Sequence, residues 1–272
     1  MTMRMPLPPS IAQHAVRHGG EIAPTRDAAT VVLLRDGDDG VEAYLMRRQR
    51  SMSFAAGMYV FPGGGVDPRD SDTDVAWAGP DPTTWAERLG CSTELARTLV
   101  CAAVRETYEE AGVLLAGPDA QTVVGDTSGA DWEEDRRALE AHSLAFSDFL
   151  RRRSLVLRTD LLGAWTHWIT PDFEPKRFDT RFFVAVMPQG QRVGALTGEA
   201  DHASWMPLRT ALASVDAGEM AMLPPTEVTC LELATLPSAD AVLEAARRRR
   251  IVPVQPRLVE VDGTFYLETE LP

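Results

Sequence analysis

One stretch decides how this chain folds: Ala102-Ala103-Val104-Arg105-Glu106-Thr107-Tyr108-Glu109-Glu110-Ala111-Gly112-Val113. Glu106, Glu109 and Glu110 stand at positions i, i+3 and i+4, and residues at these spacings share one face of a helix. Three carboxylates packed so closely repel one another, unless a divalent cation that prefers oxygen ligands neutralises them. The stretch therefore predicts a helix whose acidic end binds a metal ion.

The flanking sequence predicts where this helix begins and ends. Ser92 or Thr93 can cap its first turn, and Gly112 is a typical residue for ending a helix after Ala111. Apolar residues occupy both the glutamate face and the opposite face in the preceding turns. We therefore expect a helix buried between two layers, with only its acidic end reaching a cleft.

The rest of the chain alternates between short apolar runs and helical patterns, separated by turn residues. The expected strands are 28–35, 41–46, 59–62, 164–170, 181–187, 203–206 and a hairpin over 258–271. The expected further helices are one turn over 84–89 and longer helices over 131–153, 207–217, 228–236 and 239–249. Trp165 and Trp168 are expected to pack in the core from opposite faces of one strand. This alternation indicates a layered α/β architecture.

Composition excludes several classes of protein. The 272 residues are 44% hydrophobic, which suffices for a large core, and no run reaches the ~18 apolar residues that a membrane span needs. The net charge of −13 argues against a protein that coats nucleic acid, but it leaves room for a small polyanionic substrate. Cys91, Cys101 and Cys230 lack metal-ligand spacing and are expected to be reduced thiols. With no visible secretory or peroxisomal signal, we expect a cytoplasmic protein.

Two segments together carry a resemblance to a known family. Arg105–Val113 and Phe61-Pro62-Gly63-Gly64 resemble the Nudix hydrolase superfamily, whose box reads G-x5-E-x7-R-E-U-x-E-E-x-G-U, with U a bulky apolar residue. Thr107 stands where the pattern has an apolar residue, and the first glutamate of the box is missing. Either Asp70 or Asp74 replaces that glutamate, or no residue does.

The box is also interrupted. Between Gly64 and Arg105 lie 40 residues where the pattern has 13, which indicates an insertion of 27 residues. A long insert at this point is typical of the Nudix branch that includes the peroxisomal-type coenzyme A diphosphatases. The segments 26–35, 168–171 and 177–183 also resemble that branch.

The resemblance implies an α/β/α sandwich with a mixed sheet and an insertion inside the box. We expect an irregular N-terminal arm over 1–25 and the Nudix domain over 26–236, with the insert at about 66–91. A C-terminal helix and hairpin over 237–272 are expected to pack on the same domain.

The resemblance also implies a site that holds Mg²⁺ or Mn²⁺. Glu106, Glu109 and Glu110 are the expected metal ligands and catalytic residues, joined by the backbone at Gly64. Arg105 is expected to orient a box glutamate rather than to contact the substrate. Metal ions would neutralise the phosphates and acidify a bound water molecule.

Three further sets of residues are candidates for the same reaction. Gly63 and Gly64 are expected to let the backbone approach a diphosphate, since no Cβ intervenes. Glu199 would act as base or metal ligand, or it is a solvated loop carboxylate. Arg48 and Arg50 are expected to hold phosphate groups, although Ser53 stands where coenzyme A diphosphatases carry an arginine.

Three functions are therefore open. The first is hydrolysis of coenzyme A or acyl-coenzyme A to 3′,5′-ADP and (acyl-)phosphopantetheine. The second keeps the chemistry but acts on ADP-ribose, NADH or a dinucleotide. The third is a ligand-sensing module that has lost catalysis, which the presence of all three glutamates disfavours. The expected partner is a nucleotide-type small molecule, with no nucleic acid and no membrane; a homodimer is left open.

Overall fold

A computed structural model describes residues 2–6, 22–49, 51, 55–196, 198 and 200–271 of the chain. Its centre is a mixed sheet with eight strands in the described residues. Six of them follow the order β11-β3-β2-β10-β9-β12. The other two are β4, which pairs with β3, and β5, which pairs with β2. The strands are β2 (Thr25–Gly37), β3 (Gly40–Arg48), β4 (Tyr59–Val60), β5 (Gly63–Gly65), β9 (Leu162–Ile169), β10 (Arg177–Val186), β11 (Ala200–Pro207) and β12 (Pro253–Val254). β10 runs parallel to β2 and antiparallel to β9, which makes the sheet mixed.

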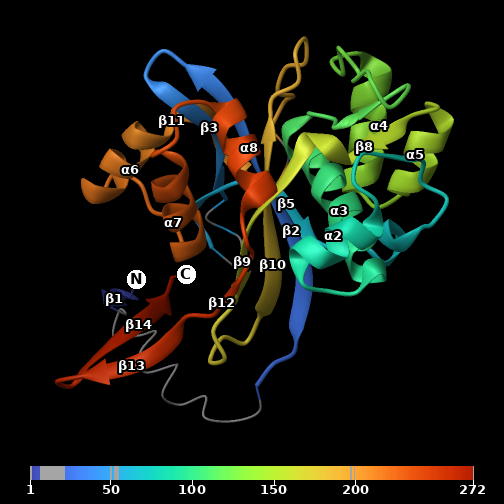
Figure 1. Ribbon diagram of the computed structural model, residues 1–272. Helices are drawn as coiled ribbons and strands as arrows, with labels where there is room; N and C mark the ends of the chain where they lie inside the picture. Colours follow the sequence, from blue (N-terminus) through green and yellow to red (C-terminus); the bar gives the residue numbers. More distant parts are fainter. Residues whose placement is uncertain are drawn as a thin grey trace.

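Helices cover both faces of this sheet (Figure 1). The helices on one face are α2 (Pro82–Leu89), α3 (Thr93–Ala111), α4 (Ala130–Glu140) and α5 (Phe146–Arg152). Those on the other face are α6 (Leu208–Asp216), α7 (Pro224–Leu233) and α8 (Ala239–Arg248). The expected α/β/α sandwich is confirmed.

Each face of the sheet has its own apolar core, because side chains alternate along a strand. Val31 and Leu33 of β2 belong to the core beneath α3, whereas Val32 and Leu34 belong to the core beneath α6, α7 and α8. None of these four side chains is exposed to solvent. The sheet is thus the shared wall of two cores.

Helix α3 begins and ends where the sequence predicts. The Ser92 hydroxyl accepts a hydrogen bond from the Leu95 N–H, and Gly112 ends the helix in the left-handed region with φ +69°. Every residue from Thr98 to Ala111 is buried, including the three glutamates. The helix lies between the sheet and α2, α4 and α5, so the expected burial is also observed.

The insert contributes to the core beneath α3. The segment 66–91, where the insert is expected, contains the 3-10 helix η1 (Pro68–Ser71), β6 (Trp77–Ala78) and α2, which is longer than the single turn expected. Trp85 of α2 is fully buried and contacts the Phe183 ring edge-on, with the ring centroids 5.8 Å apart. β6 pairs with β8 (Val156–Arg158), which also pairs with β7 (Ala116–Gly117); η2 (Thr159–Leu161) follows β8.

Three expectations about local structure are wrong. The helix expected over 131–153 is two helices, α4 and α5, separated at a left-handed turn where His142 has φ +53°. Trp165 and Trp168 share one core, because the register of β9 against β10 shifts at Trp165. The arm over 1–25 is not irregular throughout, since residues 2–6 form a strand.

That strand, β1 (Thr2–Pro6), joins a small sheet with β14 (Thr264–Glu270) and β13 (Arg257–Val261). β13 and β14 form the expected hairpin, and Asp262 and Gly263 turn it with positive φ. Met3 and Leu271 pack against the core beneath α6 to α8. Among the described residues, no helix combines the length and apolar composition that crossing a membrane would require.

Candidate active site

The acidic end of α3 lies directly against the glycine strand β5. The Gly63 N–H donates a hydrogen bond of 2.7 Å to Oε2 of Glu110. A Cβ atom at Gly64 would lie 2.6 Å from Oε1 of Glu106, which is shorter than any ordinary contact. Only glycine therefore allows the backbone and the glutamates to approach so closely.

Arg105 joins the acidic groups from the side of the protein interior. Its guanidinium donates hydrogen bonds to Oε1 of Glu106 at 2.8 Å, to Oε1 of Glu109 at 3.2 Å and to the Gly65 carbonyl at 3.0 Å. Nε and Nη2 also contact both carboxylate oxygens of Asp70, each at 2.9 Å. The Arg105 side chain is only 5% exposed, so its charge acts within this cluster.

Burial changes the acidity of these carboxyl groups. Desolvation raises the pKa of Glu106 to about 8; the Glu109 charge adds to the rise and Arg105 opposes it. Desolvation also raises the pKa of Glu109 and of Asp70, again against the opposing charge of Arg105. Without a cation, the cluster holds more negative charge than its surroundings favour.

This arrangement fits a hard divalent cation in its chemistry, because all the side-chain donors are carboxylate oxygens. The carboxylates are nevertheless paired internally: Arg105 contacts Glu106 and Glu109, and Gly63 contacts Glu110. In the described part of the chain, no three acidic, histidine or cysteine side chains already surround one point as metal ligands. Binding an ion would require these side chains to rearrange so that their oxygens converge on one point.

The comparisons with known proteins agree with this geometry. The model of the NUDT19 Nudix domain matches residues 25–233, which is most of the chain. The chain belongs to the Nudix hydrolase superfamily. Within it, the match places the domain in the NUDT19 branch. Nudix hydrolases generally use divalent metal ions and act on nucleotide-type small molecules.

A solved structure and two curated relatives are similar to this Nudix domain. A Nudix hydrolase from Alicyclobacillus acidocaldarius is 31% identical, with a TM-score of 0.72, over 82% of this chain and 97% of that one. Nudix hydrolase 7 of Caenorhabditis elegans is 26% identical over 74% of this chain, and the acyl-coenzyme A diphosphatase NUDT19 of Xenopus laevis is 24% identical over 68% of it. The matches span 57% of the length of each of these two relatives.

Asp70 occupies the place of the missing first glutamate of the box. It follows Gly64 at the x5 spacing of the pattern, and its side chain is 1% exposed against Arg105. Asp74 is exposed. The extra residues therefore lie after Asp70, where 34 residues separate it from Arg105 instead of seven. With Asp70 in this role, the spacing would start the insert after Asp70 rather than at about 66.

A second arginine, Arg136 of α4, binds the C-terminal end of the acidic helix. It was not identified as a site residue from the sequence. It donates hydrogen bonds to the Glu109 carbonyl at 2.9 Å and to the Ala195 carbonyl at 3.1 Å. The Gly194 N–H also donates to the Ala111 carbonyl at 2.8 Å. The loop between β10 and β11 is thereby fixed to the C-terminal end of α3. Glu199, which follows in this loop, lies outside the described residues.

The expected phosphate-binding arginines are placed only in part. Arg48 ends β3, and its backbone pairs with Met58 and Gly57 just ahead of the glycine strand. Arg50 lies outside the described residues. Arg47 points to the opposite face of β3 and pairs with Asp201 at 2.6 Å. Because side chains alternate along a strand, Arg48 lies on the same face of β3 as Tyr44 and Met46.

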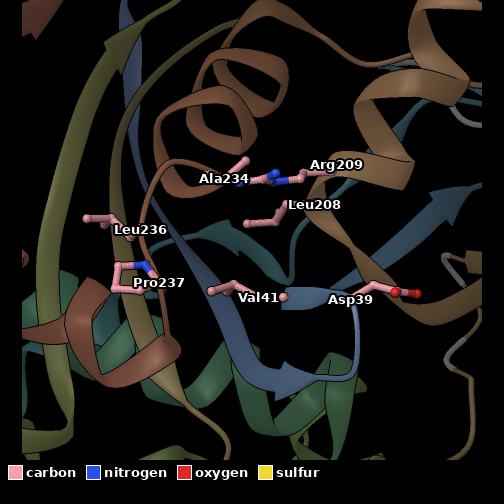
Figure 2. Close-up of a pocket in the computed structure, with 8 residues that line it drawn as sticks. Asp39, Val41, Leu208, Arg209, Ala234, Leu236 and Pro237 are labelled. Atoms are coloured by element: carbon pink, nitrogen blue, oxygen red, sulfur yellow. Dashed lines mark hydrogen bonds between the residues drawn. The ribbon is translucent and has the colours of Figure 1, made fainter.

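A hollow of about 270 Å³ lies elsewhere on the molecule (Figure 2). It is lined by Asp39, Gly40, Val41, Leu208, Arg209, Ala234, Leu236 and Pro237. Val41 and Leu208 belong to the core on the other face of the sheet from α3. The hollow therefore contributes nothing to the acidic cluster.

Proposed function

We propose that this Nudix domain hydrolyses the diphosphate bond of a nucleoside diphosphate-linked compound, with Mg²⁺ or Mn²⁺ as cofactor. The observation that supports this most is the approach of Glu106 and Glu110 to the glycine strand, with Glu109 joined to Glu106 through Arg105. All three glutamates are present and buried at one site, which disfavours the alternative of a ligand sensor without catalysis.

The residues divide into four roles. Glu106, Glu109 and Glu110, with the backbone of Gly64, would hold the metal, which when bound neutralises phosphate charge and lowers the pKa of a water molecule. The backbone of Gly63 and Gly64, which carries no Cβ, would approach the diphosphate. Arg105 and Asp70 position Glu106 and Glu109 from behind. Glu199 remains our candidate for the base.

Coenzyme A or acyl-coenzyme A is the substrate that we favour. Support comes from the match to the NUDT19 Nudix domain and from the activity after which the Xenopus laevis relative is named. Arg48, placed just ahead of the glycine strand, is the arginine that would contact a phosphate group. Ser53 departs from the arginine motif of coenzyme A diphosphatases, so ADP-ribose, NADH and dinucleotides stay as alternative substrates.

The direct test is an incubation with Mg²⁺ and each of coenzyme A, acetyl-coenzyme A, ADP-ribose and NADH, with products identified by mass spectrometry. We expect 3′,5′-ADP together with phosphopantetheine or its acetyl form. AMP from ADP-ribose or NADH, with coenzyme A intact, would retain the diphosphatase and reject this substrate. No turnover of any compound, with metal bound, would favour the sensor.

A further inference from the structure

Beside the acidic cluster, on the same face of the sheet, lies a group of side chains that the reaction above does not use. Tyr44 of β3 and Trp205 of the edge strand β11 are register partners, with ring centroids 5.6 Å apart and planes tilted by 55°. The guanidinium of Arg35 lies 4.5 Å from the centre of the Trp205 ring and pairs with Glu42 at 2.7 Å. We call Tyr44, Trp205 and Arg35 the aromatic wall.

The aromatic wall borders the proposed catalytic residues. Tyr44 is 3% exposed, and burial raises the pKa of its hydroxyl; the charge of Arg136 opposes this rise and that of Glu110 adds to it. Those two charges act on Tyr44 because they lie close to it. Two residues along β3, Met46 pairs with Val60, which leads through Phe61 and Pro62 to the glycine strand. The wall is therefore joined to the glycine strand through the pairing of β3 with β4.

The wall combines ring faces with polar groups. The Tyr44 hydroxyl and the Trp205 indole N–H are groups that usually take a hydrogen-bond partner when they are buried. Trp205 is partly exposed on an edge strand. Its ring and the neighbouring Arg35 guanidinium make a surface suited to a flat, heteroaromatic ring.

We propose that the aromatic wall binds the adenine base of the substrate, which stacks on the ring of Trp205. This inference rests on the proposed function, because coenzyme A, ADP-ribose and NADH all carry adenine beside the diphosphate. The pantetheine arm of coenzyme A has no π face, so it gains little from an indole. The wall thus assigns the nucleoside half of the substrate to the β3–β11 side of the acidic cluster.

Binding of the products 3′,5′-ADP and AMP tests this without any need for turnover. Replacing Trp205 by leucine removes the ring, and we expect the Kd of both nucleotides, measured by calorimetry with Mg²⁺ present, to rise about tenfold or more. Trp205→Phe keeps a stacking face and should stay within about threefold of the native Kd. The Kd of phosphopantetheine should not change in either variant.

Trp77 provides a matched control, because it is a partly exposed tryptophan in the insert with Arg97 over its ring at 5.1 Å. Trp77→Leu should leave nucleotide binding unchanged. If Trp205→Leu is poorly folded, the readout is quenching of tryptophan fluorescence by AMP, which Trp205→Phe should abolish while binding persists. Native-like nucleotide affinity in folded Trp205→Leu, or no nucleotide binding by the native protein, would overturn the proposal. Nucleotide binding without hydrolysis would overturn only the proposed function.

Discussion

At the residue scale, Glu109 and Glu110 are the sharpest test of the metal site. Replacing either by glutamine keeps the size of the side chain and an acceptor oxygen for Arg105 or Gly63, but removes one charge that would hold the ion. We expect Mg²⁺-dependent turnover to fall at least about a hundredfold while the circular dichroism spectrum stays native. Glu94→Gln, an exposed position in the first turn of the same helix, is the control. Undiminished turnover in both box variants would contradict the metal assignment.

Asp70 is a second residue whose charge can be tested, here by its effect on stability. Its carboxylate accepts hydrogen bonds from Nε and Nη2 of Arg105 with both side chains almost fully buried, and an asparagine amide would turn an N–H donor toward the guanidinium. Asp70→Asn should therefore lower the free energy of unfolding by about 3 kcal/mol, as measured in a denaturant titration. Asp74→Asn, at an exposed position four residues later, should change it by less than about 0.5 kcal/mol. Equal stabilities would show that Arg105 does not depend on Asp70.

The contrast between Asp70 and Asp74 shows which site residues can be located from the sequence and which cannot. The three glutamates and Arg105 could be located from the sequence, because helical spacing alone places them on one surface. The partner of Arg105 could not be chosen in this way. Asp70 is joined to Arg105 only by tertiary contacts across 35 residues. Arg136 and Ala195 meet at the end of α3 for the same reason.

At the element scale, strand β5 can lie against Glu106 because its middle residue, Gly64, has no side chain. A Cβ atom at Gly64 would meet the carboxylate of Glu106, which is the movable end of a flexible side chain, whereas a Cβ atom at Gly65 would meet nothing closer than 4.0 Å. Neither glycine has positive φ, so alanine strains the backbone at neither position. We expect Gly64→Ala to cost roughly a hundredfold in kcat by displacing Glu106, with unfolding changed by less than about 1 kcal/mol.

Gly65→Ala is the matched control for that change and should keep nearly full kcat. Steady-state kinetics and thermal unfolding of the two variants side by side separate displacement of Glu106 from general damage to the strand. If Gly64→Ala keeps the native kcat, then the position of Glu106 is not important for turnover. If both variants lose activity equally, the loss comes from general damage to the strand and not from the contact between Gly64 and Glu106.

Elements were predictable where local signals agree with tertiary packing. Ser92 and Gly112 are strong end signals, and α3 follows them. Between α4 and α5 no glycine or proline marks the break; the chain turns at His142, and Phe146 and Phe149 pack into the core below. At Trp165 a one-residue shift in pairing reverses the face of the strand, and periodicity alone carries no information about such a shift.

At the scale of the whole molecule, one sheet separates two cores, and both ends of the chain meet in a second sheet. β1 pairs with β14, which joins residues 2–6 to residues 266–270 (Figure 1). The sequence did not predict this pairing, because a five-residue strand gains its stability from a partner more than 250 residues away. The main sandwich was predictable because its strands and helices alternate along the chain.

The two cores should unfold together, since each needs the central sheet as its wall, and two thiols report on them. Cys101 lies in the core beneath α3 and Cys230 in the core beneath α6 to α8. Burial raises the pKa of each thiol to about 12. The thiolate is the form that reacts with iodoacetamide. At pH 8 the fraction of these two thiols that is ionised is therefore roughly a thousandfold or more lower in the native protein than in the unfolded chain.

We therefore expect Cys101 and Cys230 to resist alkylation in the native protein and to become reactive over the same range of urea concentration, as followed by peptide mass spectrometry. Cys91 is only partly buried, and it should be labelled first. Raising the pH to 9 should speed the labelling of Cys91 more than that of the two buried thiols, whose access depends on unfolding. Labelling of Cys230 at clearly lower urea than Cys101 would show that the α6–α8 layer opens on its own. The sheet would then not couple the two cores.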